Sequence, residues 1–231
     1  PVFGRTNLPA SVRAYFIFIL SLMLYVGTGG RLAHEPATMM EYGVMLLKEL
    51  FFGFTLGFGM ELFFLVVRFA SGIMDHSMGL SMAQVYDPQY GAQMTITSGM
   101  YYAFMILLFF STDGHLRLMG IYYGSALRIP FGMVNLRPEL PLEVLNIFQE
   151  CIFMGLQFAF PVVAMELVVE AAVGILMRIV PQINVFAVNF QLKIIVGLMM
   201  LVFLFSPMSD RLFSILNEMY TSLQHLAVLM G

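Results

Sequence analysis

The residues of this chain that could carry chemistry are charged side chains placed inside long apolar runs. They are Lys48, Glu49, Glu61, Arg68, Glu150, Glu166, Glu170, Arg178 and Lys193. Each charged residue near the centre of a membrane helix costs about 2.5–3.5 kcal/mol of insertion free energy. We therefore expect these side chains to face protein or water rather than lipid.

Two of these carboxylates form the start of a polar stripe. Glu166 and Glu170 are four residues apart, so they share one helical face, and Gly174 and Arg178 continue the same steps with a drift of about 40° each. Like charges at this spacing repel, so the stripe predicts a partner surface. An internal set of salt bridges and a proton relay are both compatible with the pattern.

Other patterns associated with catalysis or cofactor binding are weak. His34, His76, His115 and His225 are scattered without metal-ligand spacing, and neither a phosphate-binding glycine loop nor a nucleophile motif occurs. The net charge is −3 and no basic cluster is found, which argues against nucleic acid as a partner. The sequence predicts no enzymatic activity, no metal site and no cofactor.

The elements that must position the charged residues are apolar helices. The chain is 60% hydrophobic and 11% charged, against about 25% charged residues in an ordinary soluble domain. Apolar runs at 12–27, 43–70, 100–127, 151–180 and 183–206 approach or exceed the roughly 20 residues that cross a bilayer. With an amphipathic helix at 211–230, they predict an all-α, polytopic integral membrane protein with a single domain over 1–231.

Small residues and breaks punctuate these helices. Gly53, Gly57 and Gly59 allow another helix to approach closely, within the chain or from a neighbour. Pro181 breaks the apolar region at 151–206, which predicts a hairpin tip where Gln182 and Asn184 satisfy backbone groups.

A second break is richer in glycine and nearly uncharged. Residues 79–94 read GLSMAQVYDPQYGAQM. Gly79 and Gly91 supply backbone freedom, and Asp87-Pro88 prevents a helix from continuing. Irregular backbone at membrane depth is tolerated only where it is buried in protein or lines a cavity.

Three blocks of the chain resemble the FliR family of flagellar export-gate proteins, called SctT in virulence type III secretion. The blocks are Gly72-Ile73-Met74-Asp75 with Met78 to Ala83, Tyr86-Asp87-Pro88 and Gly91; Asp113-Gly114-His115 with Ser125 and Pro130-Phe131-Gly132; and Arg178 to Phe186 with Phe190 to Lys193. Pro1-Val2-Phe3-Gly4 with Pro9 and Arg13 is similar to the loop after the family's first helix, so we expect such a helix to precede residue 1.

The resemblance implies a protein of the bacterial inner membrane and the flagellar basal body. One FliR-like subunit would join several FliP-like and FliQ-like subunits in a right-handed assembly of helical hairpins, with FlhB-like and FlhA-like proteins nearby and membrane lipid around it. Unfolded flagellar export substrates would pass through the centre. The buried polar residues Glu61, Arg68, Glu166, Glu170, Arg178 and Lys193 would then meet neighbouring subunits or water.

The resemblance also implies a plug for the closed pore within residues 78–94. Its candidate residues are Met78, Gly79, Leu80, Ser81, Met82, Val85, Tyr86, Asp87 and Pro88. Met side chains adapt to varied surfaces, and an apolar constriction blocks water by dewetting. Some relatives carry Phe where this chain has Met82 and Val85, so the seal here would consist of Met and aliphatic groups.

The predicted function is therefore a subunit of the flagellar type III protein-export gate, with no catalysis of its own. A virulence-type export gate and a proton-coupled transporter that uses Glu61, Glu166 and Glu170 as a relay are the alternatives. The Asp-Pro motif followed by Gly, and the PQINVF block, favour the flagellar branch.

Overall fold

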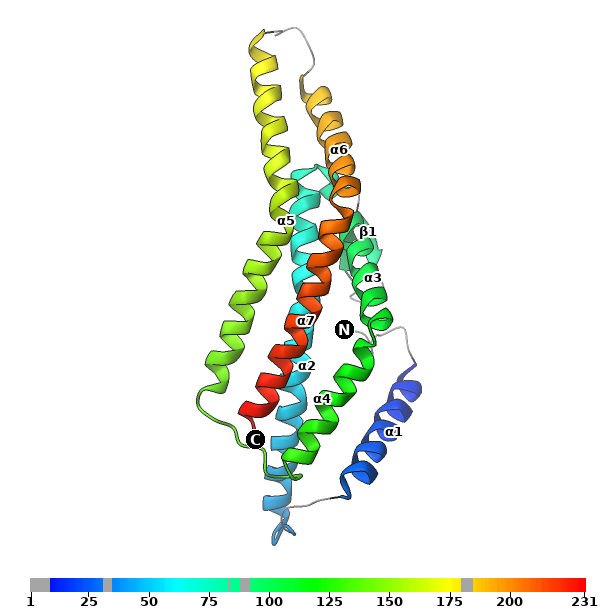
Figure 1. Ribbon diagram of the computed structural model, residues 1–231, viewed down its shortest axis with the longest axis vertical. Helices are drawn as coiled ribbons and strands as arrows, with labels where there is room; N and C mark the ends of the chain where they lie inside the picture. Colours follow the sequence, from blue (N-terminus) through cyan, green and yellow to red (C-terminus); the bar gives the residue numbers. More distant parts are fainter. Residues whose placement is uncertain (1–8, 31–34, 83, 88–91, 180–184) are drawn as a thin grey trace. The chain divides into compact units, whose positions relative to one another are not determined.

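The structure is a computed structural model that describes residues 9–30, 35–82, 84–87, 92–179 and 185–231. Figure 1 labels most of its elements. In chain order the elements are α1 (Ala10–Thr28), α2 (Met39–Ser77), the 3-10 turn η1 (Leu80–Met82), β1 (Gln84–Asp87), β2 (Ala92–Thr95), α3 (Ile96–Ser111), α4 (Gly114–Arg128), α5 (Leu140–Ile179), α6 (Val185–Phe203) and α7 (Phe205–Leu229).

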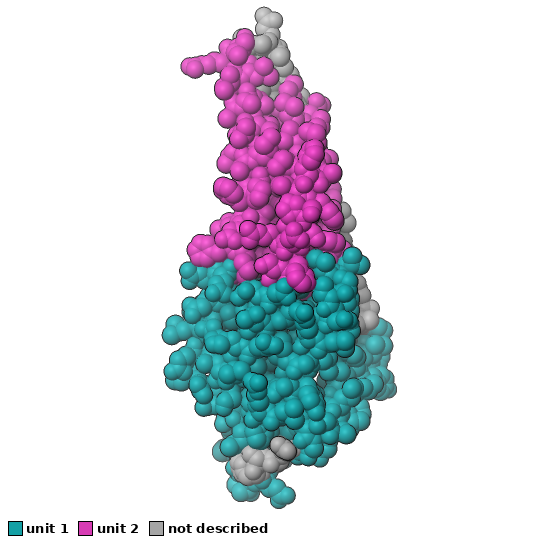
Figure 2. Space-filling model, viewed as in Figure 1, with its two compact units in different colours: residues 1–63, 106–150, 216–231 teal, residues 64–105, 151–215 magenta. Residues whose placement is uncertain are grey.

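The chain divides into two compact units, which Figure 2 shows in different colours. Unit 1 comprises residues 1–63, 106–150 and 216–231, and unit 2 comprises 64–105 and 151–215. The sequence-based prediction of a single domain over 1–231 stays a prediction.

The prediction of an all-α, polytopic membrane protein is confirmed. Among the described residues, α1, α2 and α5 are each long and apolar enough to cross a bilayer, and the number of candidate spans rises to 5 if each of two bent helix pairs is one span. β1 and β2 form a small antiparallel ribbon in which Val85 pairs with Met94 and Tyr86 with Gln93.

Local sequence explains where the first two helices begin and end. The α1 helix stops at Gly29, whose φ of 70° is the left-handed conformation that glycine adopts at little cost. At the start of α2, Thr38 Oγ1 accepts a hydrogen bond from the Glu41 N–H at 3.2 Å, which caps the helix. After α2, Gly79 is again left-handed, with φ of 78°.

One predicted helical run is broken in the structure. The apolar stretch 100–127 forms α3 and α4, which are bent by 66° relative to each other at Thr112 and Asp113. Asp113 has φ of 56°, and its carbonyl accepts hydrogen bonds from the Leu116 and Arg117 N–H groups. Apolar composition did not reveal this bend because Asp113-Gly114-His115 is too short to interrupt the run.

Unit 1 contains the second half of the amphipathic α7 helix, from Leu216 onward. Leu216, Met219, Leu223 and Leu226 repeat at helical spacing and are buried, as expected of an amphipathic helix. A Cβ at Gly59 of α2 would lie 3.2 Å from Leu223 and 3.3 Å from Leu226, so this glycine makes the predicted close contact. Gly53 and Gly57 have open space beside them instead.

The core of unit 2 contains a cluster of large side chains from three helices. Tyr101 of α3 is fully buried, its hydroxyl contacts the Met208 sulfur of α7, and its ring stacks edge to face on Phe158 of α5 at 5.2 Å. Aromatic pairs in this geometry contribute about 0.5–1.5 kcal/mol beyond their buried area. This cluster helps to hold α3, α5 and α7 together within the unit.

Candidate functional site

Glu166 and Glu170 of the polar stripe on α5 contact α6, and the two helices lie side by side in unit 2 (Figure 1). Glu170 forms an ion pair with Lys193, whose side chain is 16% exposed. One turn earlier on α5, Glu166 lies beside Gly197 of α6. Because Glu170 lies beside Lys193 and the earlier Glu166 lies beside the later Gly197, α5 and α6 are antiparallel.

Glu166 occupies an unusual environment for a carboxylate. Its side chain is buried, and among the described residues neither Oε1 nor Oε2 has a hydrogen-bond partner. The charged groups that act on it are Lys193 and Glu170, which pair with each other. Leaving a buried polar group unpaired costs about 1–3 kcal/mol, so Glu166 weakens this part of the unit.

Glycine at position 197 allows the end of α2 to reach Glu166 and α6. A Cβ at Gly197 would lie 2.3 Å from the Met78 sulfur and 3.0 Å from Glu166 Oε1. Met78 is fully buried there. Met78 of the candidate plug is thus packed between the end of α2 and the α5–α6 pair.

The next residue, Gly79, extends this contact. A Cβ at Gly79 would lie 3.1 Å from the ring of Phe190, another α6 residue. With its left-handed φ, Gly79 is a position where a side chain would be both strained and crowded. The backbone that follows α2 is therefore packed closely against α6.

The other end of the segment is held by a buried aspartate. The Thr97 N–H, in the first turn of α3, donates to Asp75 Oδ2 at 3.1 Å, and the Thr97 hydroxyl donates to the Ser71 carbonyl at 3.3 Å. Asp75 is fully buried. A carboxylate at a helix N-terminus satisfies a free N–H and interacts favourably with the helix dipole. We call the Asp75–Thr97 hydrogen bond the clamp, because it joins the two ends of residues 78–95.

Between these supports the backbone follows η1 and the β ribbon. Leu80 and Ser81 are half-buried in η1. Met82 ends η1, Val85, Tyr86 and Asp87 lie in β1, and Pro88 lies outside the described residues. A helix is indeed absent at Asp87, as its position before proline predicted, but the two short strands were not foreseen.

The remaining predicted site residues fall in several places. Glu61 and Arg68 are half-buried on α2, and Arg178 is exposed near the end of α5. The predicted hairpin tip residues Pro181, Gln182 and Asn184 lie outside the described residues. Of the predicted polar set, Lys193, Glu166 and Glu170 lie near one another in unit 2.

Four residues of the site were not predicted to support the segment: Asp75, Thr97, Phe190 and Gly197. Asp75 and Thr97 are 22 positions apart, so local spacing could not connect them. A useful signal was available for Gly197, since 166 and 197 are equidistant from the predicted tip. If two antiparallel helices are joined by a tip at Pro181-Gln182, Gly197 lies opposite Glu166.

The fold and the site define a mainly helical polytopic membrane protein, with a Glu170–Lys193 ion pair beside the buried Glu166 and a clamped segment between two helices. Residues 1–219 match the family described as "Bacterial export proteins, family 1", and the chain belongs to that family. The resemblance noted from its motifs is thereby confirmed.

Curated relatives agree with this assignment. The chain is 31% identical over 236 residues to the flagellar biosynthetic protein FliR of Bacillus subtilis, covering 100% of this chain and 90% of the relative. It is 30% identical to that of Escherichia coli, covering 93% and 82%, and 29% identical to that of Aquifex aeolicus, covering 87% and 77%.

Proposed function

We propose that this protein is a subunit of the flagellar protein-export gate in the bacterial inner membrane. Family membership supports a role in export, and relatives named as flagellar biosynthetic proteins support the flagellar assignment over a virulence-type gate. FliP-like and FliQ-like proteins are the proposed partners within the gate, FlhB-like and FlhA-like proteins are proposed beside it, and unfolded flagellar proteins are the proposed cargo.

Within that function, residues 78–94 are proposed to plug the closed pore. The observation that supports this role is the pair of fixed ends: Met78 is packed against Gly197 at the start, and the clamp fixes the base of α3 at the finish. Asp87 is the one ionisable acid or base of the Asp, Glu, Lys, Arg and His types in this stretch. A nearly uncharged segment that is anchored at both ends suits a seal, because it can move aside for cargo with varied side chains and then return to the closed position.

The assembly is tested by native mass spectrometry of the tagged chain, expressed with its neighbouring export genes and extracted in mild detergent. We expect it in a complex with several copies of two other small membrane proteins. A lone monomer or homodimer would contradict the gate assignment and would favour the transporter alternative.

The plug is tested separately in cells that assemble the complex. Deletion of residues 82–90, or combined Met82→Gly and Val85→Gly substitution, should make resting cells leak small ions while some export persists. Met133→Gly is a matched control, because Met133 is exposed and lies outside the segment. Unchanged ion permeability in a correctly assembled deletion variant would contradict the plug.

A further inference from the structure

Within unit 1, α1 touches α4 at one end and stands apart from it at the other. At the contact, the Tyr123 hydroxyl donates to the Gly27 carbonyl at 3.0 Å. A Cβ at Gly27 would lie 2.7 Å from the Tyr123 ring, so glycine is required for this approach. The contact closes one end of the space between the helices.

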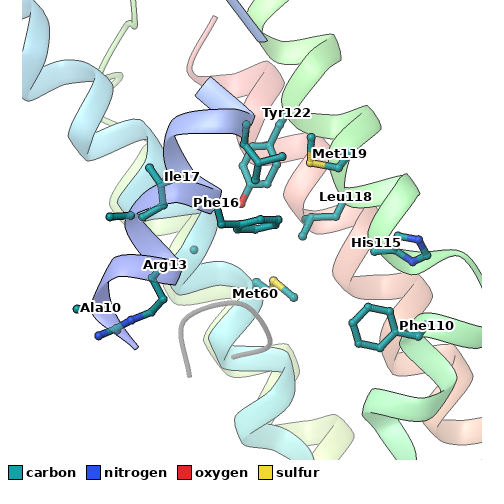
Figure 3. A pocket seen from close by; sticks show the side chains of 13 residues that line it. Ala10, Arg13, Phe16, Ile17, Met60, Phe110, His115, Leu118, Met119 and Tyr122 are labelled. Carbon is teal, nitrogen blue, oxygen red and sulfur yellow. The ribbon is translucent and has the colours of Figure 1, made fainter. Parts of the chain in front are cut away.

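Towards the beginning of α1 the helices leave a cavity of about 770 Å³, shown in Figure 3. In that view Phe16 of α1 and Leu118 and Tyr122 of α4 point towards one another across it. Its walls are almost entirely apolar and include Phe16, Ile17, Met60, Leu118, Met119 and Tyr122. The side chains of the described residues do not fill this space.

Two side chains with ring or guanidinium nitrogens, His115 and Arg13, border the cavity. Arg13 lies at the Ala10 end, and among the described residues its buried Nε has no hydrogen-bond partner. The described lining contains no Asp or Glu. The site therefore combines an apolar trough with a guanidinium group at one end, which is complementary to an amphiphile whose head is anionic.

The surroundings of the cavity indicate how an occupant would enter. α1 is a candidate membrane span, and its large apolar side chains are exposed, Tyr15 by 69% and Ile17 by 63%. A groove beside a helix that spans a bilayer would open to hydrocarbon, which would make lipid an available occupant of the cavity.

Shape distinguishes a lipid chain from a helix of another protein. A helix with its side chains is about 10 Å across. The trough is bordered by α1 and α4, and the Gly27–Tyr123 contact blocks one end of it. An acyl chain is thin enough to enter such a trough, whereas a helix would have to force α1 and α4 apart.

We propose that this cavity binds a phospholipid with an anionic headgroup, one acyl chain lying between α1, α2 and α4 and the phosphate contacting Arg13. Guanidinium groups bind phosphate by paired, charge-assisted hydrogen bonds, and basic pockets between membrane helices bind lipid headgroups. The lipid would act as a wedge that holds α1 at its distance from α4.

The site is tested on the assembled complex in nanodiscs that contain equal amounts of phosphatidylglycerol and phosphatidylcholine with identical acyl chains. After extraction, native mass spectrometry counts the retained lipids. We expect phosphatidylglycerol to be retained about fivefold over phosphatidylcholine, as expected for a partly exposed ion pair. Arg13→Gln should abolish the preference, while Arg137→Gln, at an exposed arginine outside the cavity, should preserve it.

A pair of glycine variants tests the trough itself. Gly57 lines the cavity and has open space beside it, so Gly57→Phe should fill the trough and displace both lipids. Gly53→Phe, one turn earlier on α2, also enters open space but lies outside the cavity and should leave lipid retention unchanged. Equal retention in the two variants would overturn the proposal.

A measurement on the unmodified complex covers the case in which Gly57→Phe prevents assembly. Phosphatidylglycerol with a photoreactive group in its acyl chain should label peptides from the first half of α1 and from residues 115–122. Labelling confined to other parts of the chain would overturn the proposal. In a second complex that carries a photoreactive residue at position 17, a crosslink to a partner protein rather than to lipid would also overturn the proposal.

Discussion

Glycine at position 197 determines whether α6 can pack against the end of α2. The space that a side chain would need is filled by the Met78 sulfur, 2.3 Å from the ideal Cβ position, and by Glu166 Oε1. Met78 is fully buried, so it has little room to retreat. Adding even one carbon atom at position 197 would therefore displace Met78, the first residue of the segment 78–94.

Gly197→Ala should displace Met78 and destabilise unit 2 by about 1–3 kcal/mol, the typical effect of overpacking. The measurement is the thermal unfolding temperature of the purified complex, together with limited proteolysis within residues 78–95. Gly174→Ala on α5 is the control, because a Cβ there meets nothing within 4 Å. A variant at 197 that is as stable as the control would contradict the packing described.

The buried Glu166 gives a second prediction at the same scale. Glu166→Met keeps a similar side-chain length and removes two unpaired oxygens, so the complex should become more stable by about 1–3 kcal/mol. Thermal unfolding measures the change, and export of flagellar proteins is followed in parallel. Loss of export in a stable, assembled Glu166→Gln variant would instead support a relay role for this carboxylate.

Two elements depend on contacts between residues that are far apart in the chain. The α3 helix begins where Asp75 of α2 accepts its Thr97 N–H, and α6 is aligned on α5 by the Glu170–Lys193 pair. Both α3 and α6 are therefore positioned by a residue that is distant in the sequence and comes close only in the folded chain. Their boundaries are therefore less predictable than those of α1, which ends at its own glycine.

Asp75→Ala should release the first turn of α3. Loss of a helix cap costs about 0.5–2 kcal/mol, and the Thr97 N–H should then exchange with deuterium faster. Hydrogen exchange followed by mass spectrometry on peptides spanning 92–105 provides the readout. Asp75→Asn retains an acceptor oxygen and should retain more of the protection than alanine. Identical exchange in the alanine variant and the unmodified protein would show that the clamp is unimportant.

The length of α5 limits how it can lie in a bilayer. Its 40 residues extend about 60 Å, twice the roughly 30 Å of a hydrocarbon core. Phe153 and Ile179, exposed by 55% and 71%, are separated by about 39 Å along the helix. Both can lie in the core only if the helix tilts by about 40° or more, the limit of the usual range.

Spin labels at Phe153→Cys and Ile179→Cys, in a Cys151→Ser background, test whether both positions lie in the hydrocarbon core. We expect at least one label to lie outside the hydrocarbon core, as measured by its accessibility to a water-soluble nickel chelate relative to oxygen. Two labels with the depth profile of the bilayer interior would contradict the expectation.

The molecule as a whole exposes far more large apolar side chains than a soluble protein does. Part of that surface belongs against lipid. Charged residues such as Glu150 and Arg178 are also exposed on the long α5 helix, and lipid cannot satisfy them. Under the proposed function, these surfaces are covered by neighbouring subunits.

The chain expressed without its proposed partners should therefore be degraded faster than in their presence. Pulse-chase labelling in cells with and without the neighbouring export genes measures its half-life. A chain that is equally long-lived in both cases, and monodisperse after extraction, would contradict an obligate role in an assembly. An unrelated polytopic membrane protein expressed in both strains serves as the control.

Much of this molecule was predictable from sequence, and the exceptions have a common cause. Apolar composition predicted the membrane class, and helical spacing predicted that Glu166 and Glu170 would face a partner. The bend at Asp113 and the clamp at Asp75 were missed because each depends on one residue's conformation or on a partner elsewhere in the chain. The open cavity beside Gly57 was also invisible, since a glycine that permits close contact and one that borders empty space look identical in a sequence.

The clamp also bears on how this protein can change over evolution. Because Asp75 and Thr97 hold the ends together, the residues between them form a closed loop whose span does not depend on its length. Doubling the length of a flexible loop adds only about 0.6 kcal/mol to the entropy of closure. Insertions and deletions near Pro88 should thus be tolerated more readily than replacement of Asp75 by a residue without an acceptor oxygen, or of Thr97 by proline, which has no N–H to donate.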